Sequence, residues 1–245
     1  MTWLLVLAQL AANLLRLGAG IALAARRTQT APGRRTLALA ALGGAAATLV
    51  QQAGGAPVLV LGAEAAVVAA AAAGGKVRVC NVIPKHLESI TAKLRDAGVT
   101  VVEYDDSVEV SRKGKLLSVR LKTQPYPGFP TDMQPQLTAL MTVASGESHI
   151  REGVYDKRFG YVSELAYMGA KISVDDDLCI VNGVEKLTGA KVRSLDLRAG
   201  AAMIIAGLMA EGVTEIEDKG YIERGYEDLI NKFRSIGADI TREEV

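Results

Sequence analysis

Aromatic residues, histidines and cysteines are scarce in this 245-residue chain. Phe, Trp and Tyr make up 4% of it, and there are two histidines and two cysteines. So few rings argue against stacking on nucleic-acid bases, and a net charge of +1 gives no electrostatic reason to bind a polyanion. Two histidines are too few for a histidine-based metal site, and Cys80 and Cys179 lack metal or redox spacing, so we expect no metal and no cofactor. Cysteines without such spacing favour a reducing compartment, and we predict a cytoplasmic protein.

Acidic residues are nearly absent from the first 75 positions, which hold five arginines and one acid, Glu64. Residues 3–25 are mostly apolar and long enough to cross a bilayer as a helix. Three polar side chains fall on one narrow face of that helix: Gln9, Asn13 and Arg16. This pattern favours a helix that packs on the protein by its apolar side, although a membrane anchor stays open. With a second Ala/Leu-rich stretch at 36–50, we predict a helical hairpin over 1–56.

The rest of the chain repeats with a period of roughly 70 residues, which indicates copies of one supersecondary unit that share a core. Each copy begins with a helix of small apolar residues, predicted over 63–73, 131–145 and 197–211. Because a helix without a polar face must be buried, the pattern predicts an α/β domain with three central helices and sheets around them. We place this domain at 57–245, with repeats at about 62–121, 122–190 and 191–245.

The proline-rich segment 122–134 is the most distinctive run of the sequence. Its prolines and Gly128 predict an extended, turned approach to a helix. Asp132 then lies in the first helical turn, where backbone N–H groups lack partners. Its carboxylate is either an ordinary helix cap or part of a site for a charged or hydroxylated ligand, and spacing alone leaves both open.

A series of motifs supports a more specific interpretation. They lie at 75–79, 83–88, 122–134, 158–165, 187–190, 196–199 and 224–227. In this order, the sequence from about residue 62 to 245 resembles the enolpyruvyl transferases, above all those that act on UDP-N-acetylglucosamine. The resemblance implies half of an inside-out α/β barrel protein, in which two such domains bind phosphoenolpyruvate and the UDP-sugar between them. It also implies transfer of the enolpyruvyl group to the sugar 3-hydroxyl, which opens peptidoglycan synthesis.

The resemblance assigns roles to seven residues. It implies that Asp132 is the catalytic base that takes the proton of the sugar 3-hydroxyl, and that Arg224 closes onto phosphoenolpyruvate. The other substrate-binding positions are Arg158, Val154, Tyr155, Asp196 and Arg198, of which Tyr155 replaces the usual phenylalanine. Taken alone, the charged ones could be surface ion partners or helix caps, and Glu64 an acid with a structural role.

The sequence lacks the other half of the implied active site. In the resembled family a second domain contributes a Lys-Asn pair, a phosphate-binding arginine and a cysteine in a glycine-rich loop, and none is found here. We therefore expect no significant turnover by this chain alone, with a complementary domain as a further partner and no nucleic acid. The alternatives are a non-catalytic UDP-sugar-binding or structural module, a truncated or engineered chain, or a protein anchored in a membrane through 3–25.

Overall fold

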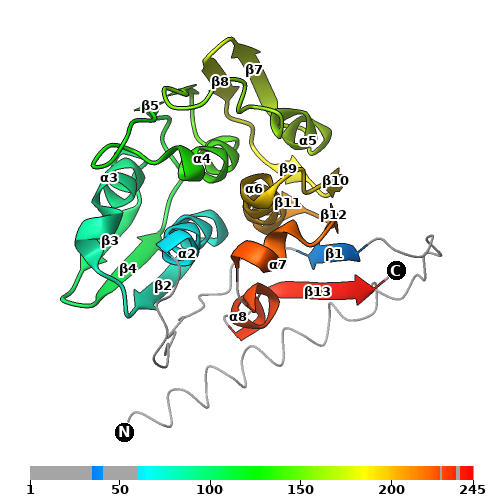
Figure 1. The fold of residues 1–245 in the computed structure, drawn as a ribbon, viewed down its shortest axis with the longest axis horizontal. Helices are drawn as coiled ribbons and strands as arrows, with labels where there is room; N and C mark the ends of the chain where they lie inside the picture. The colour runs from blue at the N-terminus through cyan, green and yellow to red at the C-terminus, as the bar shows by residue number, and fades with distance from the viewer. Residues whose placement is uncertain (1–34, 41–59, 227, 236–237, 245) are drawn as a thin grey trace, which may run out of the picture. The chain divides into compact units, whose positions relative to one another are not determined.

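Three helices with at most one charged residue each lie side by side in the computed structural model of the protein (Figure 1). They are α2 (Val60–Ala73), α4 (Gln134–Met141) and α6 (Leu197–Met209), and each contacts the other two. Every residue of α4 is buried, and so is most of α6. The sequence predicted these buried helices. The structure describes residues 35–40, 60–226, 228–235 and 238–244, which belong to one unit.

Sheets surround the helices (Figure 1). The first has the order β2 (Gly75–Cys80), β4 (Ser107–Arg112), β3 (Thr100–Glu103), and the second β5 (Arg120–Lys122), β6 (Glu147–Arg151), β8 (Leu178–Asn182), β7 (Lys171–Asp175). The third is β10 (Lys191–Arg193), β12 (Val213–Asp218), β1 (Arg35–Ala40), β13 (Asp239–Glu244), and β9 (Leu187–Thr188) pairs with β11 (Ala210–Glu211). Over the described residues these sheets stay separate and form no closed barrel. The fold is therefore mixed α/β.

Shorter helices connect the strands. They are α3 (Glu88–Asp96), which follows the 3-10 helix η2 (Pro84–Leu87), α5 (Val162–Tyr167), α7 (Tyr221–Gly225) and α8 (Leu229–Ser235). Two of them end in the same way: Gly98 after α3 and Gly169 after α5 have φ values of 81° and 91°. This left-handed conformation favours glycine and lets the next amide bond back into the helix. The two helices thus share one type of C-terminal ending.

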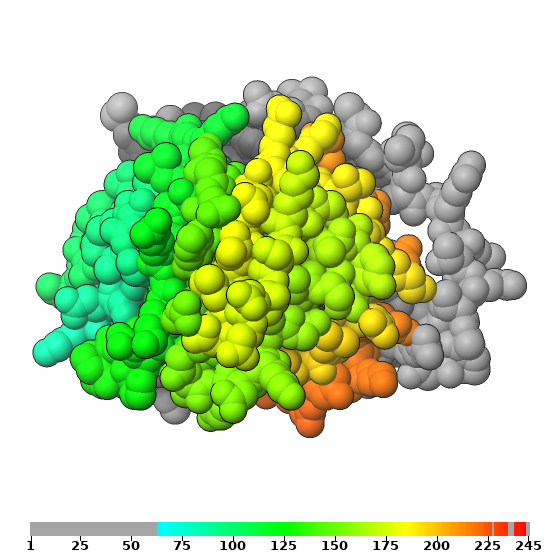
Figure 2. Space-filling view, turned by 90° about the horizontal axis from the view of Figure 1, so that it is seen from above, coloured from blue at the N-terminus to red at the C-terminus, as the bar shows by residue number. Residues whose placement is uncertain are grey.

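Seen from above, the middle of the chain occupies the centre of the visible face, between cyan residues on the left and orange residues at the lower right (Figure 2). Its green to yellow surface belongs to the part that contains the second sheet. Within that sheet β5 and β6 are parallel, whereas β8 is antiparallel to both β6 and β7. Ile150 and Cys179 are paired across β6 and β8 and are both buried, so this sheet turns an apolar face toward the core.

A strand near the N-terminus departs from the predicted helical hairpin. Residues Arg35–Ala40 form β1, which lies between β12 and β13 and is antiparallel to both. Because a strand in the middle of a sheet has hydrogen-bonding neighbours on both sides, tertiary pairing here outweighs the helical preference of Ala and Leu. The hairpin prediction is thus wrong at 35–40. The rest of 1–56, including the proposed anchor at 3–25, lies outside the described residues.

We also searched the described residues for a membrane span. None of the helices in this part of the chain combines the length and the apolar character that a bilayer crossing needs. The longest of the central helices, α2, has 14 residues.

Candidate functional site

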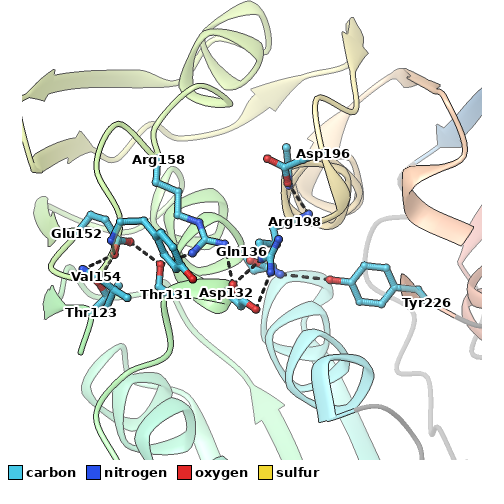
Figure 3. Close-up of polar contacts among 12 residues, drawn as sticks. Thr123, Thr131, Asp132, Gln136, Glu152, Val154, Arg158, Asp196, Arg198 and Tyr226 are labelled. Carbon is cyan, nitrogen blue, oxygen red and sulfur yellow. Dashed lines mark hydrogen bonds and ion pairs between the residues drawn. The ribbon is translucent and has the colours of Figure 1, made fainter. Parts of the chain in front are cut away.

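Asp132 is the centre of a cluster of charged side chains (Figure 3). It lies in the 3-10 helix η3 (Thr131–Met133), which leads directly into α4. The preceding Pro130 is extended, with φ −69° and ψ 134°, as the proline-rich run predicted. No side chain caps η3, so the Asp132 carboxylate is not an ordinary helix cap. It faces two arginines instead.

Arg198 binds both oxygens of this carboxylate. Its Nε donates to Oδ1 of Asp132 at 2.5 Å and its Nη2 donates to Oδ2 at 2.9 Å. The planar guanidinium suits this two-point contact, which fixes orientation as well as charge. Asp196 caps α6: its Oδ1 accepts the backbone N–H of Arg198 at 2.7 Å and of Ala199 at 2.9 Å. These bonds fix the backbone of Arg198.

Arg158 approaches Asp132 from the other side (Figure 3). Its Nη2 donates to Oδ1 of Asp132 at 2.7 Å, and its Nη1 donates to the hydroxyl of Thr131 at 2.6 Å. The same guanidinium lies 4.8 Å from the ring centre of Tyr155, a cation–π contact. Arg158 therefore joins η3 to the loop that follows β6.

Glu152 organises that loop and was missed by sequence reasoning. Only 4% of its surface is exposed. Its Oε1 accepts the Thr123 hydroxyl at 2.6 Å and the backbone N–H groups of Val154 at 2.9 Å and Tyr155 at 3.2 Å. Its Oε2 accepts the Thr131 hydroxyl at 3.0 Å. Nothing in the sequence around Glu152 distinguishes it from a surface acid at the end of a strand.

The charges of the cluster hold Asp132 ionised. Burial by itself raises the pKa of this carboxyl, but the hydrogen bonds and charges of Arg198 and Arg158 outweigh it, and the pKa is lowered. The hydrogen bond to Asp132 in turn raises the pKa of Arg198. Glu64 behaves differently, because burial, followed by the nearby charge of Asp132, raises its pKa to about 7. The two carboxyl groups therefore differ in charge near neutral pH.

Arg224 lies outside the cluster. It is exposed on α7, with its guanidinium 5.1 Å from the ring centre of Tyr221. The next aromatic residue, Tyr226, is buried, and its hydroxyl accepts a hydrogen bond from Nε2 of Gln136 at 3.4 Å. Burial raises the pKa of Tyr226 to about 12, so its hydroxyl is neutral. Tyr226 thus ties the Arg224 segment to α4.

A shallow pocket opens beside the cluster. It has a volume of about 500 Å³. Its walls combine charged side chains of both signs with apolar surface, and include Tyr155, Asp156, Lys157, Arg158, Leu195, Asp196 and Arg198. Tyr155 is 60% exposed and Leu195 40%. Such walls suit a ligand that carries both an anionic group and an apolar or planar part. Of the seven residues implied by resemblance, six meet at this cluster or its loop, and Arg224 does not.

Comparisons with known proteins identify the family of the chain. The model of the family EPSP synthase (3-phosphoshikimate 1-carboxyvinyltransferase) matches residues 61–233. The chain is 56% identical over 169 residues to a UDP-N-acetylglucosamine 1-carboxyvinyltransferase of Clostridium botulinum, a match that covers 69% of this chain and 40% of that protein. A protein of the same name from Desulfofundulus thermocisternus is 53% identical over 168 residues, with 69% of each chain covered.

A solved structure shares the fold. The enolpyruvyl transferase NikO from Streptomyces tendae superposes with a TM-score of 0.68 at 29% identity, over 74% of this chain and 44% of that one. The chain thus spans about 40% of the length of the clostridial relative and 44% of NikO. Since the family model matches well over half of the chain, this protein belongs to the EPSP synthase family.

Proposed function

We propose that the described domain is one half of an enolpyruvyl transferase that acts on phosphoenolpyruvate and UDP-N-acetylglucosamine. The observation that carries the proposal is the carboxylate of Asp132, held between Arg198 and Arg158 at the edge of a half-apolar pocket. The relatives that bear this activity in their name support the choice of substrates. In this proposal the three central helices and their outer sheets are half of an inside-out α/β barrel.

The arginines would bind the anionic groups of the substrates. Guanidinium groups bind carboxylate or phosphate oxygens through two parallel hydrogen bonds. In this structure Arg198 and Arg158 donate these hydrogen bonds to Asp132. A bound anion would compete for them, with Tyr155 and Leu195 against the uncharged part of the ligand. Arg224, exposed on α7, would add a further positive charge.

The same competition would turn Asp132 into a base. While both arginines bind it, its lowered pKa makes it a weak proton acceptor. Transfer of either arginine to a substrate anion removes that stabilisation and raises the pKa of the carboxyl. Asp132 could then take the proton of the sugar 3-hydroxyl as the hydroxyl oxygen attacks phosphoenolpyruvate. Asp132 is thus the residue that we propose as the catalytic base.

The catalytic groups on the opposite side of the substrates would have to come from a second domain. Addition of the hydroxyl to the enol also needs an acid that protonates the enol carbon. The two cysteines of the chain do not suit this role: Cys179 is buried, and burial raises its pKa to about 12, while Cys80 is part of β2. We therefore propose that the domain binds substrate but turns over only with a complementary domain. Free thiols at both cysteines fit a cytoplasmic location.

A calorimetric titration of the full chain with UDP-N-acetylglucosamine tests the binding role. Arg198→Ala should weaken binding about tenfold or more, since a two-point charged contact is removed. The matched control is Arg151→Ala, because Arg151 is an exposed arginine that pairs with Asp177. Equal affinity of the two variants would contradict the site.

A phosphate-release assay with both substrates tests whether turnover needs the groups of a second domain. The chain alone should release phosphate no faster than a blank without protein. Robust release would show that turnover does not need a second domain. A non-catalytic UDP-sugar-binding module would also bind without turnover. An added complementary domain should restore turnover for half of an enzyme and not for such a module.

A further inference from the structure

Glu64 is a second carboxyl group near Asp132. It lies near the beginning of α2 and only 6% of its surface is exposed. Helix α2 packs against η3, the 3-10 helix that contains Asp132. Within the described part of the chain, no hydrogen bond or ion pair of Glu64 is found. A buried carboxylate without a partner is costly, so such a group keeps its proton to higher pH than an exposed one.

The helices around Glu64 supply little positive charge. Helix α4 contains no charged residue, and the only cation of α6 is Arg198, which already binds Asp132. The hydroxyl of Tyr226, also within electrostatic reach of Glu64, is neutral. Buried Gln136 adds an Oε1 that has no hydrogen-bond partner among the described atoms. This side of the site therefore does not compensate a negative charge on Glu64.

The remaining elements packed on α2 direct their cations elsewhere. Arg112 of β4 donates to the carbonyls of Ala71 and Ala72, at the opposite end of α2. The cations of β2 and α3 are paired with other acids: Lys76 and Arg78 with Glu109, Lys93 with Asp96, and Arg95 with Glu103. The one further acid of α3 is Glu88. Asp132 is thus the charged group of η3 that Glu64 meets, and it repels a second negative charge.

We propose that Glu64 is a further binding determinant of this site, which must be uncharged for the cluster to hold an anion. The cluster and the pocket wall hold three cations, Lys157, Arg158 and Arg198, and three acids, Asp132, Asp156 and Asp196, so their charges balance while Glu64 is neutral. With Glu64 ionised, the site carries one net negative charge, which disfavours an anion. Anion binding should therefore take up a proton at Glu64 near neutral pH. The proposal rests on the proposed function for the identity of the anion.

A titration without ligand tests the first half of the claim. Carboxyl carbon NMR of the full chain from about pH 3 to pH 9, with Glu64→Gln to assign the signal, should give a midpoint near pH 7, in line with the raised pKa of Glu64. A midpoint near that of an exposed glutamate, about 4.3, would overturn the proposal. This result does not depend on which ligand the site takes.

Calorimetry tests the second half. UDP-N-acetylglucosamine and, separately, inorganic phosphate are titrated at pH 7.5 in two buffers of different ionisation enthalpy. The wild type should take up roughly three quarters of a proton per ligand, and its affinity should fall toward tenfold per pH unit above pH 7. Glu64→Gln should lose both effects and bind as the wild type does at low pH. Glu185→Gln, which changes an exposed glutamate, should keep them.

The two ligands separate failure of this inference from failure of the proposed function. If phosphate binds with Glu64-dependent proton uptake and the UDP-sugar does not bind, the substrate assignment is wrong and the role of Glu64 stands. If either ligand binds without proton uptake, or with the same uptake in Glu64→Gln, the role of Glu64 is overturned. If neither ligand binds at any pH, the cluster is not an anion site and the proposal fails with it.

Discussion

The guanidinium of Arg198 holds both oxygens of the Asp132 carboxylate, with Nε 2.5 Å from Oδ1 and Nη2 2.9 Å from Oδ2. Arg198 lies in the first turn of α6 and Asp132 lies just before α4, so this contact joins the N-terminal ends of two central helices. Arg158 adds a second cation to the same oxygen, Oδ1. The site therefore depends on how these two helices pack, and one carboxylate lies between two arginines at its centre.

Replacing Asp132 by asparagine should destabilise the protein by about 1–3 kcal/mol at pH 7, because two partly buried arginines lose their counter-charge. The folded pKa of Asp132 is lowered, so its stabilising effect is complete above the unfolded value and is lost as the pH falls through the folded one. Urea unfolding at pH 7 and at pH 3 measures the difference between wild type and variant. A difference at pH 7 no larger than that at pH 3 would contradict the account.

Replacing Glu64 by glutamine should stabilise the protein at alkaline pH. Its folded pKa, about 7, lies above the reference value of 4.5, so the folded state loses stability as the pH rises from 4.5 to 7 and keeps that loss above it. The loss amounts to at most about 3 kcal/mol. Thermal unfolding should give the variant a higher Tm than the wild type at pH 8 and a nearly equal Tm at pH 5. A Tm difference that does not change with pH would argue against a buried, proton-holding Glu64.

Gly200 sets the position of α7 and with it that of Arg224. A Cβ on Gly200 would lie 2.5 Å from Cγ1 of Ile222 and 2.6 Å from Oγ of Ser194. Gly200→Ala should therefore displace α7 and cost about 1–3 kcal/mol by overpacking, despite the better helix propensity of alanine. Gly160→Ala is the matched control, since a Cβ there would meet nothing within 4 Å. Urea unfolding measures the stability of both variants. Equal stability would contradict the tight packing of α7 against Gly200.

Proline at Leu37 should open the third sheet. Leu37 pairs with Ile216 of β12 on one side and with Arg242 of β13 on the other. Proline removes a ladder hydrogen bond from a strand in the middle of a sheet, and we expect a loss of about 3 kcal/mol and aggregation through the exposed strand edges. Light scattering on heating compares Leu37→Pro with Leu37→Val, which keeps the N–H group. Identical behaviour of the two would mean that β1 is dispensable.

Local sequence was enough to predict the central helices but not β1. Alanine-rich stretches without a polar face can only be buried, whatever they pack against. The residues of β1, Arg-Thr-Leu-Ala-Leu-Ala, suit a helix as well as a strand, and their conformation depends on β12 and β13, which lie far away in the sequence. Such tertiary pairing leaves no mark within the segment itself.

The site shows the same division. Asp132, Arg158 and Arg198 stand in motifs that the family resemblance singled out, and the fold brings their side chains into contact. Glu152 and Gln136 were missed, since their importance comes from the hydrogen bonds that the fold brings together. Glu64 was predicted to be a structural acid, and only its burial beside Asp132 gives it an unusual proton affinity.

NMR mapping of UDP-N-acetylglucosamine binding on the full chain tests the central claim most directly. The account predicts that backbone amide shifts on addition of the ligand concentrate at Val154, Arg158 and Arg198, which border the pocket and its loop, and that Arg198→Ala needs about tenfold more ligand, or more, to show shifts in this loop. Shifts confined to another face of the domain, or unchanged shifts in Arg198→Ala, would contradict it.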